Sequence, residues 1–158
     1  MGYGCSADAH HFTEPDPTGV NPARAMRLAL DEAGMDASAI DYINAHGTST
    51  PVGDSAETRV IKQVLGEERA YQVPVSSTKS MTGHMLGAAG STELSLTALA
   101  LCRGILPPTI NQFESDPECD LNYIPNRSIA KSAEISLCNC IGFGSKNSAL
   151  VIARGDLG

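Results

Sequence analysis

The chain has 158 residues, of which 42% are hydrophobic and 18% charged, a composition typical of one globular domain with a core rather than of a disordered segment. Its formal net charge of −7 argues against nucleic acid or an anionic membrane surface as the main partner. Aromatic residues make up only 4% and tryptophan is absent, so we expect a core of aliphatic side chains.

The five cysteines do not predict a disulfide framework or a zinc site, because their number is odd and no C-x-x-C occurs. We therefore expect reduced thiols, no metal and a cytosol-like compartment. The N-terminal MGYGCSADAHH does not resemble a signal peptide. The longest apolar run, residues 94–106, is interrupted by Thr97 and Arg103, so no membrane span is predicted.

The first predicted elements are a helix and a strand. Asn21 and Pro22 fit the cap and first residue of a helix that ends at Gly34. Residues 40–45 are predicted as a short strand, which leads into the loop HGTSTPVG.

A second helix follows this loop, with Asp54 and Glu57 spaced as a capping box and Gly66 as the stop signal. Residues 73–76 are predicted as a second short strand. The next helix, residues 86–103, is apolar nearly all the way round, which is typical of a helix buried between two layers.

Two further strands, residues 134–141 and 148–154, are joined by GFGSKN and suit an antiparallel pair with a glycine turn. The order of elements predicts an α/β layered fold with a mixed sheet and helices on both faces. A chain of this length does not supply another layer beyond the apolar helix.

Ionisable side chains follow two of the predicted strands. His46 comes directly after the first strand, and Lys79 and His84 come just after the second. Ligand sites in open α/β sheets gather beyond the carboxyl ends of strands, so we expect these residues at one edge. Glu93 falls in the apolar helix, where an unpaired carboxylate is costly, and an ion pair with Lys79 would relieve that cost.

Each of these residues also has an ordinary structural explanation, as a turn histidine, a solvated lysine or a surface glutamate. Together they favour a specific chemistry. Two neutral imidazoles can donate N–H bonds to one carbonyl oxygen and stabilise an enolate or a tetrahedral oxyanion, and a nearby ammonium keeps them neutral. This predicts carbon–carbon chemistry on thioesters, in which decarboxylation gives an enolate that attacks an acyl group.

Other chemistries have less support. The motifs of serine hydrolases and P-loop enzymes, G-x-S-x-G and G-x-x-x-x-G-K-[ST], do not occur. His46, Ser49 and Asp54 are the residue types of a catalytic triad, but such coincidences are common. A metal at His46 and His84 would need further ligands, and a Schiff base on Lys79 would lack a phosphate-binding loop.

The motifs NAHGTSTPVGDSAE, SSTKSMTGHMLGAAGSTE, LPPTIN and NCIGFGSKN occur in this order. Together they resemble the C-terminal half of β-ketoacyl-acyl-carrier-protein synthases, most closely the synthase II type of fatty acid elongation. The resemblance covers essentially the whole chain, as one C-terminal domain of residues 1–158. It implies the thiolase fold, in which two similar halves form α-β-α-β-α layers and helix 86–103 packs against its counterpart in the other half.

The resemblance also implies roles for individual residues. His46 and His84 match the two histidines of a Cys-His-His site, which hold the malonyl thioester carbonyl through decarboxylation and condensation. Lys79 matches the lysine of the K-S-x-x-G-H motif, and Glu93 matches its supporting glutamate.

Three further residues match substrate-binding positions of the family. Thr48 and Thr50 match the threonines that meet the pantetheine arm, and the alternative is that Ser49 or Thr50 caps the helix that follows. Phe143 matches the gating phenylalanine of a glycine-rich loop, whose backbone N–H helps to form the oxyanion hole.

The sequence departs from the family pattern in two respects. None of its cysteines lies in the motif of the nucleophile, which belongs to the N-terminal half, so we expect a fragment or one piece of a split synthase. In addition, Ile141, Ser145 and Lys146 change the glycine-rich loop, which puts gating and chain-length preference in doubt.

The function expected from this resemblance is that of a 3-oxoacyl-[acyl-carrier-protein] synthase, an acyltransferase inactive without its N-terminal half. Its partners would be acyl carrier protein and a second copy in a homodimer. The carrier's phosphopantetheine holds the substrates, so no separate cofactor is expected. The compartment would be the cytoplasm, or the plastid or mitochondrial matrix if the protein is organellar. A non-catalytic subunit of the chain-length-factor type, or a scaffold, is the alternative.

Overall fold

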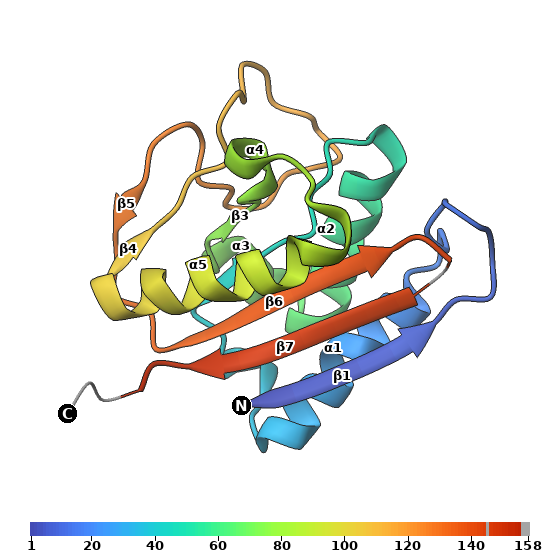
Figure 1. The fold of residues 1–158 in the computed structure, drawn as a ribbon, viewed down its shortest axis with the longest axis horizontal. Helices are drawn as coiled ribbons and strands as arrows, with labels where there is room; N and C mark the ends of the chain where they lie inside the picture. Colours follow the sequence, from blue (N-terminus) through green and yellow to red (C-terminus); the bar gives the residue numbers. More distant parts are fainter. Residues whose placement is uncertain (145, 156–158) are drawn as a thin grey trace.

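The computed structural model describes residues 1–144 and 146–155. Its centre is a five-stranded mixed sheet (Figure 1). The strands of this sheet are β1 (Gly2–Ala7), β2 (Tyr42–Asn44), β3 (Val75–Ser76), β6 (Ile135–Gly142) and β7 (Lys146–Ala153). A separate small ladder pairs β4 (Ile105–Leu106) with β5 (Ile129–Ala130).

The strand order is β1-β7-β6-β2-β3. β2 runs parallel to both β3 and β6, whereas β7 runs antiparallel to β6 and β1. The carboxyl ends of β3, β2 and β6 therefore meet at one edge of the sheet, which is where side chains from three separate segments can converge.

Helices cover both faces of the sheet, as predicted (Figure 1). The helices are α1 (Val20–Ala33), α2 (Pro51–Leu65), α3 (Glu67–Gln72), α4 (Lys79–Thr82) and α5 (Ala89–Arg103), with 3₁₀ turns η1 (Ala37–Ala39) and η2 (Leu86–Ala88). On one face, α1 and α2 pack on a core that includes Ile43, Leu137 and Val151. On the other face, α5 packs on Tyr42 and Ile152.

The start of α1 differs from the prediction. The helix begins at Val20, and its cap is Gly19 in the left-handed conformation (φ 67°), so Asn21 and Pro22 lie inside the first turn. Proline is tolerated there because the first backbone N–H groups of a helix have no partner within the helix.

The predicted capping box of α2 was wrong. The cap is Thr50, whose Oγ1 accepts a hydrogen bond from the Gly53 N–H at 3.2 Å. Asp54 and Glu57 lie inside the helix, and their carboxylates reach back to the loop before it. Asp54 accepts from the Ser49 N–H at 3.1 Å.

The predicted helix 86–103 is divided into η2 and α5, and its two sides differ. The side of α5 that faces the sheet includes the polar Glu93 and Thr97, both buried. Apolar side chains lie on the outer side, where Leu99 is 50% exposed, and Leu86 in η2 is 73% exposed. That a further layer covers them in the complete protein stays a prediction.

None of the helices in the described part of the chain has the length and hydropathy that a membrane span needs.

Candidate functional site

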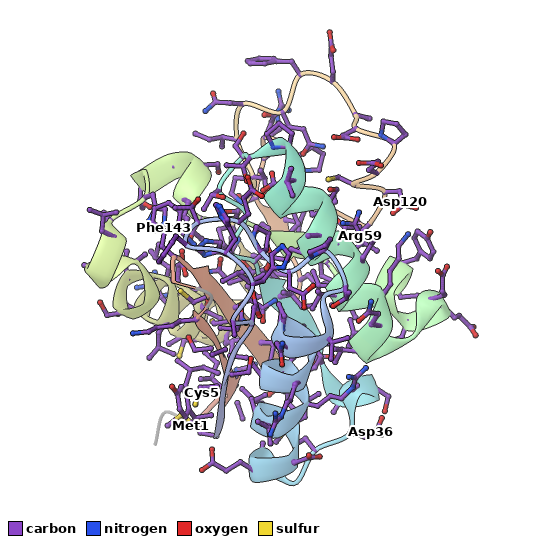
Figure 2. The ribbon with its side chains drawn as sticks, turned by 90° about the vertical axis from the view of Figure 1, so that its right-hand side faces the viewer. Met1, Cys5, Asp36, Arg59, Asp120 and Phe143 are labelled. Carbon is purple, nitrogen blue, oxygen red and sulfur yellow. The ribbon has the colours of Figure 1, made fainter. Side chains whose placement is uncertain are left out.

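The predicted site residues reach the same edge of the sheet from three parallel strands. His46 follows β2, Lys79 opens α4 shortly after β3, and Phe143 directly follows β6. Figure 2 labels Phe143, which is 71% exposed in the turn between β6 and β7. The parallel pairing of these strands is the reason that segments far apart in the sequence converge.

The rings of His46 and His84 lie against each other. Their centroids are 5.5 Å apart and their planes meet at 87°, an edge-to-face arrangement. His46 is buried, with 9% of its surface exposed, whereas His84 is exposed. One ring is thus fixed in the protein and the other stands beside it at the surface of this chain.

The hydrogen bonding of His84 determines which nitrogen can donate. Its Nδ1 accepts from the Leu86 N–H at 3.1 Å, in a tight turn where Leu86 has a φ of 52°. The neutral ring must then carry its hydrogen on Nε2. This leaves an N–H donor on the far side of the ring from the turn.

His46 is held in its neutral form. Burial is the main cause that lowers its pKa from 6.5 to about 3, and the Lys79 ammonium and His84 act in the same direction. No residue in the described ranges donates to or accepts from its Nδ1. A buried neutral imidazole with an unpaired nitrogen suits a hydrogen-bond role toward a ligand.

Lys79 and Glu93 form a buried ion pair, the pairing that the sequence suggested. The exposed fractions of the two residues are 7% and 3%. Burial raises the pKa of Glu93, while the Lys79 ammonium acts in the opposite direction. Since α4 carries the lysine and α5 carries the glutamate, the pair fixes the position of the ammonium that acts on His46.

The role of Glu57 in the site was not predicted, because the sequence pattern had placed this residue in a capping box. Its Oε1 accepts from the His46 N–H at 2.9 Å and from Asn139 Nδ2 at 3.2 Å, and its Oε2 accepts from the Gly47 N–H at 2.9 Å. The buried carboxylate therefore fixes the backbone that carries His46. One sequence signal was present, because Glu57 shares the buried face of α2 with Val60 and Ile61.

The predicted substrate-binding residues lie outside this cluster. Thr48 is half-buried, and its Oγ1 is 3.5 Å from that of Thr50, the α2 cap. Across residues 1–144 and 146–155, no hydrogen bond or ring contact joins Thr48, Thr50 or Phe143 to the two histidine rings.

Two of the three loop residues that depart from the family pattern lie in the described part of the chain. Ile141 is half-buried in β6, and Lys146 is the exposed first residue of β7. Ser145 lies outside the described residues. The described segments contain no cluster of three or more His, Cys, Asp or Glu side chains suited to a metal ion.

Residues 1–113 match the family model described as the β-ketoacyl synthase C-terminal domain. The chain belongs to this family. It is 47% identical to 3-oxoacyl-[acyl-carrier-protein] synthase 2 of Synechocystis and 46% identical to that of Vibrio harveyi, in each case over 98% of this chain and 37% of the relative. The chain thus spans little more than a third of the length of these β-ketoacyl synthases.

Solved ketosynthases share its fold. A β-ketoacyl synthase from Burkholderia phymatum is 42% identical with a TM-score of 0.90, covering 98% of this chain and 36% of that one. A complex of a type II acyl carrier protein with its ketosynthase bound to a hexaketide gives a TM-score of 0.94 at 38% identity, covering 98% and 38%. These neighbours confirm both the family resemblance and the thiolase-like α/β fold predicted from the sequence.

Proposed function

We propose that this β-ketoacyl synthase domain is the C-terminal part of an acyltransferase that elongates fatty acids. The complete protein condenses malonyl-carrier-protein with an acyl thioester and releases carbon dioxide. The observation that carries the proposal is the pair of touching rings, His46 and His84, beside a buried ammonium. The names of its relatives, 3-oxoacyl-[acyl-carrier-protein] synthase 2, support the same reaction.

The two imidazoles act on one oxygen. Each donates an N–H to the thioester carbonyl of the malonyl group, so that negative charge can gather on that oxygen as the bond to the leaving carboxylate breaks. A cysteine in the remaining part of the complete protein holds the acyl group as a thioester. The enolate attacks the carbonyl of that thioester, and the thiolate of the cysteine leaves. Donors of this kind are each worth about 10²–10³-fold in rate.

The surroundings of His46 keep its ring in the neutral form. Burial and the Lys79 ammonium hold His46 neutral, while Glu93 balances the ammonium from α5. Glu57 positions the backbone of His46 and Gly47. Lys79, Glu93 and Glu57 therefore support the site through His46 rather than through contact with the reacting atoms.

The proposal places Thr48, Thr50 and Phe143 where the substrates enter the site. The two hydroxyls offer hydrogen bonds to the pantetheine arm of the carrier, and the exposed Phe143 ring gates the approach of the acyl chain. The substrates arrive on phosphopantetheine, so the reaction requires no other cofactor and no metal. Acyl carrier protein, the N-terminal half and a second copy of the complete protein are its partners, in the cytoplasm or an organellar matrix.

The test is a condensation assay on the complete protein, with malonyl- and acyl-carrier-protein as substrates. We expect His46→Ala and His84→Ala each to reduce turnover by about 10²–10³-fold. Turnover within a few-fold of the unsubstituted protein in either variant would contradict the assignment.

A chain-length-factor-like subunit is the second candidate, because similar structures include the ishigamide ketosynthase/chain length factor, with a TM-score of 0.91 at 39% identity. A subunit of this kind needs no neutral imidazole donors, so the His46–His84 pair favours the enzyme. If the complete protein condenses substrates only after a separate ketosynthase is added, and does so equally well without both histidines, the second candidate is correct.

A further inference from the structure

A small cavity lies where α1 and α2 meet the β6–β7 hairpin. Its lining includes the apolar Pro22, Met26, Val60 and Ile141, the two asparagines Asn139 and Asn147, and also Cys140 and Ser148. None of these side chains belongs to the histidine pair or to the Lys79–Glu93 ion pair. The cavity volume is about 10 Å³. One water molecule needs roughly 10–15 Å³ of this kind of volume, so the cavity has room for one water at most.

The strand register brings the two asparagines together on one face. Ile141 pairs with Asn147 across the hairpin, and Asn139 lies two positions before Ile141 on β6. Side chains two positions apart on a strand point to the same face, so the two amides are diagonal neighbours. Both asparagines are 3% exposed.

Neighbouring carboxylates fix the orientation of the two asparagine side-chain amides. Asn139 Nδ2 donates to Glu57 Oε1 at 3.2 Å, and Asn147 Nδ2 donates to Asp8 Oδ1. Because an ionised carboxylate only accepts hydrogen bonds, the amide nitrogens must face Glu57 and Asp8. The two Oδ1 atoms are turned away from these carboxylates, and neither has a hydrogen-bond partner among the residues that the structure describes.

We propose that this cavity binds one water molecule that donates one hydrogen to each asparagine Oδ1. A water has two hydrogens to give, and two buried acceptors require them. Burial of an amide oxygen without a donor is unfavourable, and in the described structure no lining residue, Ser148 and Cys140 included, donates to either Oδ1.

The bound water completes a continuous hydrogen-bonded chain from α2 to the end of β1. The chain runs from Glu57 through Asn139, the water and Asn147 to Asp8. Glu57 also holds the backbone of His46. The water therefore ties the loop that carries His46 to the β6–β7 hairpin and to the segment that follows β1.

The experiment is a crystal structure of the complete protein at a resolution that shows ordered water, with the Asn147→Leu variant and a matched Met26→Leu control. We expect a density peak about 2.5–3.0 Å from both Oδ1 atoms in the unsubstituted protein and in Met26→Leu, and its loss in Asn147→Leu. If Asn147→Leu does not fold, the structures of the unsubstituted protein and of Met26→Leu still show whether the water is present.

Three results would overturn the proposal. They are an unsubstituted structure with no peak at this position, a peak in contact with only one asparagine, and an anomalous peak there after a rubidium soak. The last result would assign the cavity to a monovalent cation instead of water.

Discussion

The chemistry of His46 follows from its surroundings rather than from the residue itself. Burial removes water from its ring, and the Lys79 ammonium adds an unfavourable charge for any proton that would bind there. Both effects favour the neutral ring over the whole physiological range.

The first prediction concerns this titration. In the unfolded chain the residue takes up a proton below about pH 6.5, and in the folded protein only near pH 3. The contribution of His46 to stability is therefore complete above pH 6.5 and is lost as the pH falls between these two values. We expect the ring resonances of His46 in the ¹³C-histidine-labelled protein, assigned with His46→Gln, to stay constant from about pH 8 to about pH 4. A midpoint near pH 6.5 would contradict this expectation.

Glu57 gives the second prediction. A Gln side chain has one acceptor oxygen, whereas the three N–H groups around Glu57 use both carboxylate oxygens. Glu57→Gln should lower the free energy of unfolding by about 1.5–3 kcal/mol. It should also reduce condensation, since the His46 backbone loses an anchor. Glu67→Gln, on the exposed start of α3, is the control and should change neither quantity.

The sequence could predict the histidines and the ion pair because each residue follows a strand or interrupts an apolar pattern. Glu57 was missed for a physical reason. Two of its three hydrogen-bond donors are the backbone N–H groups of His46 and Gly47. Every residue except proline has such a group, so the residue types in the loop do not predict these bonds.

Among the elements, each helix and strand that the sequence predicted is present with shifted ends, but β1 and the short elements α3, α4, β4 and β5 were not predicted from the pattern of residues. α1 begins after Gly19, which adopts the left-handed conformation, and α2 begins after Thr50, whose side chain makes one capping hydrogen bond. In both places neighbouring residues could also have served as the cap, so the sequence does not determine the first residue of the helix. The division of the predicted helix 86–103 depends on the turn around His84 and Leu86, which periodicity does not reveal.

The third prediction concerns the role of Thr50 as the cap of α2. Thr50→Ala removes the cap of α2 and should destabilise the protein by about 1 kcal/mol, measured by chemical denaturation. Thr50→Ser keeps a capping oxygen and should retain most of the stability. If alanine and serine are equally stable, the cap contributes nothing.

For the molecule as a whole, the main open question is the outer side of α5, which carries apolar side chains that no part of the described chain covers. It buries Glu93 and Thr97 against the sheet and turns Leu99 outward, and Figure 1 shows nothing in front of it. An apolar pattern on all sides predicts that both sides are covered, but a sequence does not show which partner covers the second side.

The fourth prediction follows from this exposed side. Leu86 and Leu99 are exposed in this chain, and we expect them to be covered in the complete protein. The isolated chain 1–158 should therefore bind a hydrophobic dye more strongly, per mole, than the complete protein. Leu99→Gln in the isolated chain should weaken the dye signal. Equal dye binding by the isolated chain and the complete protein would mean that this side stays open to solvent.

If the His46 and His84 rings together stabilise one developing oxyanion, as we propose, decarboxylation of a malonyl thioester isolates that step from acyl transfer. The decisive measurement is the rate of carbon dioxide release by the complete protein and by its His46→Ala and His84→Ala variants. We expect each variant to release carbon dioxide about 10²–10³-fold more slowly than the unsubstituted protein. A rate within about tenfold of the unsubstituted protein for either one would contradict the proposal.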